Sequence, residues 1–204
     1  LELLWPDSEH ELSLLGAIKP ILKGTGDISV HHIEEIPDST IGLLVGDLGL
    51  SIFEDKLSDA WPRCHDGQED AFRITSSFYR VMAIAAENWK ADVVLVDVGP
   101  NLGAINRVAL IASEYVVVPL APDLFSLQGL KNLGPSLRKW RREWGERLTA
   151  NPNPDLKLPK GRMETVGYVI LQHAVRVDRP VRAYQRWMER IPQVYRKYVL
   201  DESA

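Results

Sequence analysis

Two short apolar runs with a helical pattern between them constrain the fold most strongly. Residues 93–96 form the first run, which ends at Asp97. Residues 115–118 form the second run, which Pro119 stops. Because their apolar residues are continuous and do not alternate with polar ones, both runs are typical of parallel strands covered on both faces. The pattern therefore predicts two parallel strands joined by a right-handed helical crossover.

A helix between the runs is indicated by apolar residues that recur on one face, namely Ile105, Val108, Ala109 and Ala112. The crossover would place Asp97 and the turn at residues 99–103 at the carboxyl end of the first strand. Ligands of open α/β sheets bind at that edge. We therefore expect a three-layer α/β/α domain with a mainly parallel sheet and a ligand site near Asp97.

The remaining elements are predicted from apolar spacing and from turn residues. We expect helices at residues 12–21, 71–89 and 126–144, the last of them interrupted at Gly134 and Pro135. We expect strands at residues 41–45 and 166–171, a turn entering a helix at 47–57, and an exposed connection at 58–70. The chain shows no linker and no low-complexity tract, so residues 1–204 are predicted to form a single, incomplete domain.

Cysteine usage and hydropathy indicate the cellular compartment in which the chain is expected. Cys64 is the single cysteine, so the chain can form no internal disulfide, and a reducing cytoplasm is expected. Its neighbour His65 could act as a base for a thiol nucleophile, but adjacent side chains rarely face one another and no third orienting group is evident. No apolar run approaches the length of a membrane span.

Three segments together resemble the ParA/MinD/Soj-type ATPases, the deviant Walker A family of P-loop NTPases. Residues 93–133 are similar to that family's strand ending in Asp, its Gly/Pro loop, and its second strand with a Pro-rich loop. Residues 43–57 resemble its strand-turn-helix segment, and residues 165–172 resemble a later strand that leads toward the nucleotide base. The resemblance extends over roughly residues 40–200 and implies the fold of a P-loop NTPase.

One motif of the family is missing. No G-x-x-x-x-G-K-[ST] loop occurs anywhere in the 204 residues. The nearest imitation, residues 23–27, lacks the Lys-Ser/Thr ending and is interpreted as a surface turn. The chain also begins at Leu1 and not at methionine. We expect the first strands and the phosphate-binding loop to be absent from this chain, which would then be inactive as an ATPase by itself.

The resemblance implies ATP and Mg²⁺ as cofactors and gives roles to the loop after the first run. Asp97 would accept a hydrogen bond from a water on Mg²⁺, although a helix N-cap or turn residue is the alternative. Gly99 would allow a backbone N–H to approach a phosphate oxygen, and Pro100 belongs to the same loop. The family more often has Thr or Pro where this chain has Val98.

The resemblance also gives roles to residues that follow the later strands. Pro119, Pro122 and Asp123 match the loop that passes the base, although prolines there also end a strand. Gln172 stands where relatives commonly have an Asn that reads adenine, and its carboxamide offers both a donor and an acceptor. An exposed glutamine at a strand end is the alternative interpretation.

Charge is divided unevenly along the chain. Residues 131–204 contain 16 Lys/Arg and 8 Asp/Glu, whereas residues 1–130 contain 8 Lys/Arg and 20 Asp/Glu. This division indicates a basic face with polyanions as partners, although basic helices are often simply solvated. The family binds DNA without sequence preference through such a face. The resemblance implies DNA contacts by Arg138, Lys139, Arg141, Arg142, Arg176, Arg179 and Arg182.

The family's activity is the expected function. We expect an ATP-dependent switch that forms a homodimer around nucleotide, responds to an activating protein, and acts in plasmid or chromosome partitioning or positioning. Open alternatives are a non-hydrolysing binding module of the same fold, a MinD-like ATPase of the membrane surface, and a nucleotide-dependent synthase or reductase. The single Cys64 argues against an iron–sulfur version of the last class. Pro192 interrupts the amphipathic stripe of residues 187–200, so membrane binding is not expected.

Overall fold

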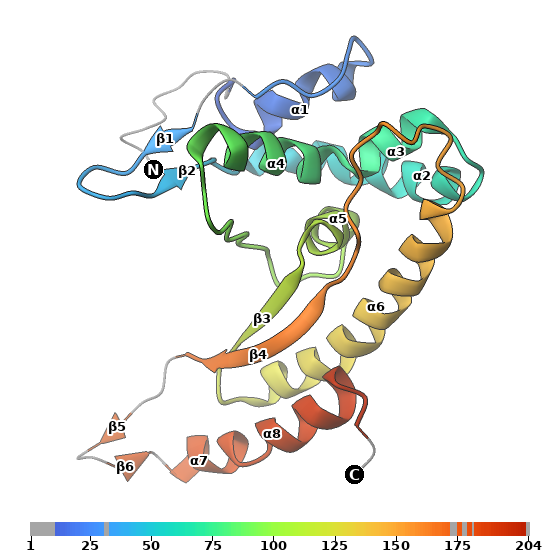
Figure 1. The fold of residues 1–204 in the computed structure, drawn as a ribbon. Coiled ribbons are helices and arrows are strands. Elements are labelled where there is room, and N and C mark those ends of the chain that lie inside the picture. The colour runs from blue at the N-terminus through green and yellow to red at the C-terminus, as the bar shows by residue number, and fades with distance from the viewer. Residues whose placement is uncertain (1–10, 31–32, 172–174, 177–178, 181, 203–204) are drawn as a thin grey trace. The chain divides into compact units, whose positions relative to one another are not determined.

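The chain folds into two compact units in a computed structural model (Figure 1). The first unit comprises Leu1–Ala112 and Glu146–Lys160, and the second comprises Ser113–Gly145 and Gly161–Ala204. The structure describes residues 11–30, 33–171, 175–176, 179–180 and 182–202, with the backbone alone for those between 175 and 184.

The first unit is mainly helical. Its elements are α1 (Leu14–Lys23), the short strands β1 (Glu34–Glu35) and β2 (Gly42–Leu43), the 3₁₀-helix η1 (Leu48–Phe53), α2 (Glu54–His65), α3 (Glu69–Thr75), α4 (Ser77–Trp89) and α5 (Ala104–Ala112). Helix α4 packs against α1 and α5. The Ser13 hydroxyl caps α1 by accepting a hydrogen bond from the Gly16 N–H, and Gly24, with φ of 65°, ends it in the left-handed conformation that glycine allows.

The prediction of an exposed connection at residues 58–70 is wrong. Helix α2 continues through Pro62 to His65, and its Trp61 and Cys64 side chains are buried. The Trp61 ring lies within 4.3 Å of the Arg107 guanidinium and within 4.2 Å of the Arg147 guanidinium. These cation–π contacts and the burial of an aromatic ring stabilise a helix that its proline and aspartate content disfavours.

The predicted strand at residues 93–96 is also wrong for this chain. The segment lies in the first unit and forms no ladder, and the Val93 and Leu95 side chains are 72% and 91% exposed. A strand requires a neighbouring strand for its backbone N–H and C=O groups. Within the described residues no strand pairs with this run, so its β-branched composition by itself does not produce a sheet.

The second unit contains the parallel sheet. Its elements are β3 (Tyr115–Leu120), most of α6 (Leu124–Leu148), β4 (Glu164–Ile170), β5 (Val175–Arg176), β6 (Arg179–Pro180), α7 (Arg182–Met188), α8 (Ile191–Val194) and the π-helix η2 (Tyr195–Val199). Strand β3 pairs in parallel with β4 from Tyr115↔Glu164 to Leu120↔Ile170, with one irregularity at Val116/Val117. The sheet is small, but helix and parallel strand alternate as the predicted α/β class requires.

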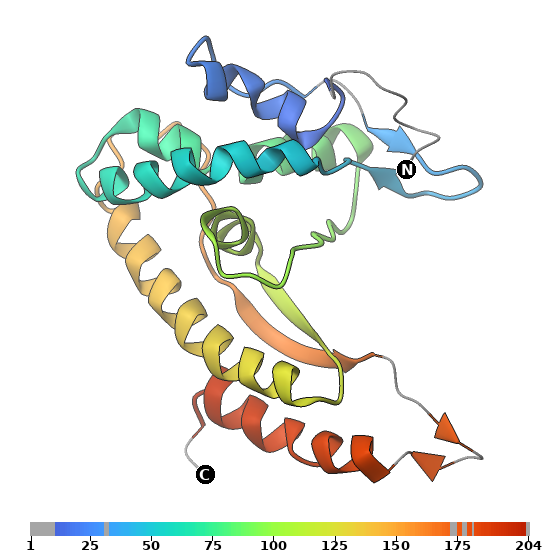
Figure 2. The same ribbon diagram turned by 180° about the vertical axis from the view of Figure 1, so that it is seen from behind.

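Helix α6 is not interrupted at Gly134 and Pro135, contrary to the prediction. It runs for 25 residues with Pro135 inside it. A side chain on residue 134 would place its Cβ only 1.8 Å from the Tyr198 carbonyl oxygen, so glycine allows the C-terminal helices to run directly beside α6 (Figure 2). Trp144 of α6 is fully buried. Among the described residues, neither α6 nor any other helix is long and apolar enough to cross a membrane.

Candidate functional site

The loop after the first apolar run is at the surface of the first unit. Asp97, Gly99 and Pro100 are all exposed. Helix α5 begins seven residues after Asp97, at Ala104, so Asp97 does not cap it. Within the described part of the chain, the Asp97 carboxylate makes no hydrogen bond and no ion pair. An exposed carboxylate without a structural partner can accept a hydrogen bond from a ligand or a metal-bound water.

The buried Asn106 holds this loop from within α5. Its side-chain amide donates hydrogen bonds to the Gly99 and Asn101 carbonyl oxygens, each at 2.7 Å. The same amide lies 3.1 Å from the Asn101 Oδ1 atom, which also accepts from the Gly103 N–H at 3.0 Å. Asn106 is only 6% exposed, whereas Gly99 and Asn101 are exposed, so the bonds tie the surface turn to a buried side chain of α5.

Glu54, the first residue of α2, holds the other end of the loop. Its carboxylate accepts hydrogen bonds from the first N–H groups of α5, those of Ala104 and of Ile105, the latter at 2.9 Å. A Cβ on residue 103 would lie 2.7 Å from the Glu54 Oε1 atom, so Gly103 allows this approach. A carboxylate at a helix N-terminus is favoured by the helix dipole. The loop is therefore attached to α2 as well as to α5.

Sequence reasoning missed both Asn106 and Glu54. Asn106 had a usable signal, because it is a polar residue within the apolar spacing that predicted α5. Glu54 lies in the segment whose resemblance to the family was noticed, but 50 residues separate it from Ala104. Contacts at that separation follow from the tertiary fold and not from local spacing.

The predicted base-side residues lie in the second unit, at the connection from β3 to α6. Pro119 is exposed and Pro122 is fully buried. Asp123 caps α6, because its Oδ1 atom accepts from the Ser126 N–H at 2.7 Å. The Ser126 hydroxyl in turn accepts from the Ala121 N–H at 3.0 Å. Gln172, the predicted adenine reader, lies outside the described residues.

The predicted DNA-binding residues of α6 have more internal contacts than expected. Arg138 donates to the Tyr198 and Val199 carbonyl oxygens at 2.9 and 3.3 Å. Arg141 donates to the Arg162 and Met163 carbonyl oxygens, both at 2.7 Å. These bonds connect α6 to η2 and to the start of β4. Lys139 and Arg142 are exposed, and Lys139 lies 3.9 Å from Glu143.

The other three predicted DNA-binding residues lie close together in sequence after β4. Arg176 and Arg179 face one another as partners in the antiparallel β5–β6 pair. Arg182 is the first residue of α7. The backbone therefore brings two of these arginines side by side on a hairpin that leads into the third.

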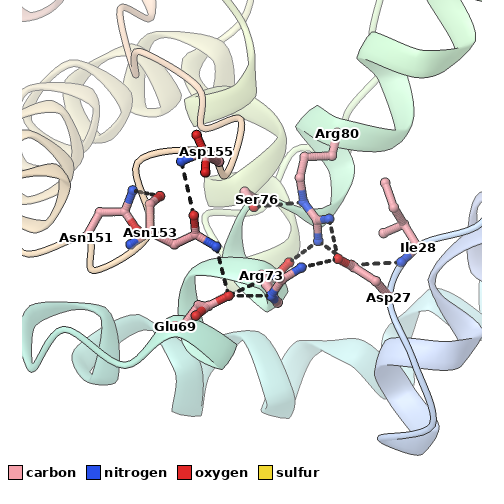
Figure 3. A network of polar contacts seen from close by, with 9 residues as sticks. All are labelled: Asp27, Ile28, Glu69, Arg73, Ser76, Arg80, Asn151, Asn153 and Asp155. Atoms are coloured by element: carbon pink, nitrogen blue, oxygen red, sulfur yellow. Dashed lines mark hydrogen bonds and ion pairs between the residues drawn. The ribbon is translucent and has the colours of Figure 1, made fainter.

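The turn at residues 23–27, the nearest imitation of a phosphate loop, has a structural role. Asp27 accepts two hydrogen bonds from the buried Arg80, at 2.8 and 2.7 Å, and forms an ion pair with Arg73 at 2.5 Å (Figure 3). The Ile28 N–H adds a bond at 2.8 Å. Burial by itself would raise the pKa of Asp27, but the bonds from Arg80, Ile28 and Arg73 outweigh it and lower the pKa below its usual value.

The same network extends to the loop after α6 in the first unit. Glu69 accepts from Arg73 at 2.7 Å and from the Asn153 side chain at 3.0 Å (Figure 3). These hydrogen bonds, first from Asn153 and then from Arg73, lower the pKa of Glu69. Asp27 and its neighbours therefore stabilise the fold, and the interpretation of residues 23–27 as a turn without a phosphate site agrees with these contacts.

Cys64 should not react with thiol reagents in the folded chain. Its side chain is buried, its sulfur lies 3.4 Å from the Thr75 hydroxyl, and burial raises its pKa to about 11. At pH 8 the thiol is therefore protonated, and a reagent cannot reach it. Dithionitrobenzoate at pH 8 should release one equivalent of thiolate in denaturant and almost none from native protein. Rapid labelling of the native chain would contradict the buried position.

Comparison with known proteins decides the family. A sequence model for a family described as "AAA domain" matches residues 21–150, which is more than half of the chain. The chain belongs to this family. Among solved structures, protein DIP2308 from Corynebacterium diphtheriae is similar, with a TM-score of 0.72 and 25% sequence identity over 95% of this chain and 66% of that one. The predicted ParA-type P-loop NTPase fold is thereby confirmed.

Curated relatives match shorter parts of this AAA domain chain. The virulence plasmid ParA family protein pGP5-D of Chlamydia psittaci is 43% identical over 42 residues, which are 21% of this chain and 16% of that protein. An uncharacterized protein of Pseudomonas putida is 31% identical over 75 residues, 37% of this chain and 25% of its own length. The chain thus spans a quarter or less of these curated relatives. P-loop NTPases in general use a nucleotide and Mg²⁺.

Proposed function

We propose that this chain is the switch and DNA-binding part of a ParA-like ATPase, a nucleotide-dependent dimerising switch that acts in DNA partitioning or positioning. The observation that supports this most is the loop at residues 97–103. It presents an exposed carboxylate at Asp97, followed by a turn that Asn106 and Glu54 hold through hydrogen bonds. An exposed polar loop held by a buried side chain, here Asn106, suits the sensing of a ligand.

The residues present suit part of a nucleotide site. Mg²⁺, when bound beside ATP, would supply charge neutralisation at the phosphates. Asp97 would accept a hydrogen bond from a water on that ion, and Gly99 would offer a backbone N–H to a phosphate oxygen. For Pro119, Pro122 and Asp123 in the second unit, and for Gln172 outside the described residues, a role beside the base stays a prediction. The sequence supplies no Walker-type lysine, so the chain by itself is proposed not to hydrolyse ATP.

DNA is favoured over a membrane as the surface that the basic half binds. The apolar residues of the C-terminal stripe are needed inside the second unit: Ile191, Tyr195 and Val199 are 0%, 6% and 7% exposed. An interfacial helix must present such residues to lipid. Lys139 and Arg142 are exposed cations of α6, and the arginines of the β5–β6 hairpin are proposed to join them in binding phosphate backbones.

Reversing two charges on this surface should abolish most DNA binding. Arg179→Glu with Arg182→Glu should weaken the binding of an ATP-loaded protein to random duplex DNA by about tenfold or more and reduce the slope of log K against log salt by about two. Fluorescence anisotropy over a salt series measures both quantities. Lys157→Glu with Lys160→Glu, an equal charge change on exposed residues of the first unit, is the matched control. Affinity that ignores salt, or binding only to anionic vesicles, would contradict the proposal.

A further inference from the structure

A groove of about 520 Å³ lies entirely within the second unit. It is bordered by the middle of α6, the start of β4 and the end of η2. Its lining residues are Gly134, Leu137, Arg138, Arg141, Arg162, Glu164, Thr165, Val199 and Leu200. The close approach of η2 at Gly134 brings the last turn of the chain against α6 and forms one side of this groove. Three arginines thus share one concave surface.

The two arginines from α6 are oriented by neutral carbonyl oxygens, and Arg138 also forms an ion pair with Asp201. Arg138 and Arg141 lie three residues apart, and each donates to two main-chain carbonyl oxygens. Carbonyl oxygens are neutral, so they fix the guanidinium groups and do not cancel their charge. A guanidinium has five N–H donors, and each group keeps donors that these bonds do not use. Orientation before binding lowers the entropic cost of holding an anion.

Arg162 completes the set. Its backbone carbonyl accepts the bond from Arg141, and its exposed side chain makes no hydrogen bond or ion pair with any described residue. Two carboxylates oppose the three cations: Asp201 lies 3.4 Å from Arg138, and Glu164 lines the groove. The remaining charge is positive. The Glu164 carboxylate is a hydrogen-bond acceptor and the Thr165 hydroxyl is a donor. Together they suit hydroxyl groups on the organic part of a phosphate ester.

We propose that this groove binds a phosphate group through Arg138, Arg141 and Arg162. A phosphate has several acceptor oxygens in different directions, which three separate guanidinium groups can share, whereas one carboxylate is satisfied by a single arginine fork. The phosphate can come from a nucleic-acid backbone or from a free phosphate compound. In the first case the groove adds Arg162 to the DNA surface proposed above and rests on that proposal. In the second case it stands alone.

Charge-matched variants of the 204-residue chain separate these cases. Arg162→Glu should weaken binding to a 20-base-pair random duplex by about tenfold, because it removes one charge-assisted contact and adds a repulsion. Lys157→Glu makes the same charge change outside the groove and should alter the affinity less than about twofold. Glu164→Gln should tighten binding, because it removes a negative charge from the groove. Thermal melting of Arg162→Glu checks that its fold is unchanged.

Inorganic pyrophosphate distinguishes the two sources. Displacement of the duplex by pyrophosphate, with the ionic strength held constant, would show that free phosphate compounds enter the groove. Duplex binding that Arg162→Glu weakens and pyrophosphate does not displace would assign the groove to a nucleic-acid backbone. If Arg162→Glu and Lys157→Glu weaken duplex binding equally, the proposed phosphate site in the groove is wrong, and the proposal of DNA binding by the other arginines is unaffected. If the chain binds neither the duplex nor pyrophosphate, the proposed phosphate site is wrong, and the groove no longer supports the proposal of a DNA-binding surface.

Discussion

Asp27→Asn should lower the free energy of unfolding of this chain by roughly 2 kcal/mol at pH 7. The substitution removes the counterion of Arg80, whose side chain is 9% exposed, and leaves a buried cation with neutral partners. Breaking a buried ion pair from one side typically costs about 3–5 kcal/mol. We expect less here because the Asp27 side chain is 34% exposed and water can partly replace it.

The effect of Asp27→Asn should depend on pH in one direction. The folded chain holds the pKa of Asp27 below its usual value, so the carboxylate stabilises the fold at every pH above about 4. This contribution is lost as the pH falls through the folded pKa. The difference in stability between wild type and variant should therefore be constant from about pH 5 to pH 8 and shrink below about pH 4.

Urea denaturation at a series of pH values measures this difference. Asp66→Asn is the matched control, because Asp66 is exposed and makes no ion pair with any described residue. It should leave stability almost unchanged at neutral pH. Two results would contradict the role given to the network in Figure 3. One is a difference in unfolding free energy between wild type and Asp27→Asn that is as large at pH 3 as at pH 7. The other is a difference at pH 7 that is no larger for Asp27→Asn than for Asp66→Asn.

Local sequence pattern was sufficient for the elements whose partners lie in the same unit. The run at residues 115–118 became β3 because β4 pairs with it, and the leucine spacing after Pro122 predicted α6. The run at residues 93–96 is equally apolar and rich in valine but has no pairing strand among the described residues, so it stays out of any sheet. Strand formation depends on a neighbour, which composition does not report.

Predictions near the site failed where tertiary contacts decide. Trp61 keeps α2 helical through a proline because Arg107 and Arg147 stack on its ring. Glu54 reaches the start of α5 across 50 residues of sequence. Asp97 was predicted at the end of a strand that does not form in this chain, and its role toward Mg²⁺ stays a prediction. Arg138 and Arg141 were recognised as basic, but their bonds to backbone carbonyl oxygens could not be read from spacing.

Asp97→Ala should reduce ATP hydrolysis by roughly a hundredfold or more in a protein where this chain is joined to a phosphate-binding loop. In the proposed role Asp97 would accept a hydrogen bond from a water on Mg²⁺, so its removal would weaken the binding of an ion that would neutralise phosphate charge. The fold should not change, since Asp97 is exposed and makes no hydrogen bond or ion pair with any described residue. Asp92→Ala, an exposed carboxylate in the same segment, should keep full activity.

The magnesium-dependent rate of ATP hydrolysis tests the proposed switch most directly. It should be measured for the 204-residue chain, for the protein joined to a phosphate-binding loop, and for the latter with Asp97→Ala or Asp92→Ala. We predict turnover only with the phosphate-binding loop present, retained in Asp92→Ala and lost in Asp97→Ala. Wild-type turnover in Asp97→Ala would contradict the role of the loop at residues 97–103. Magnesium-dependent hydrolysis by the 204-residue chain alone would contradict the requirement for a phosphate-binding loop.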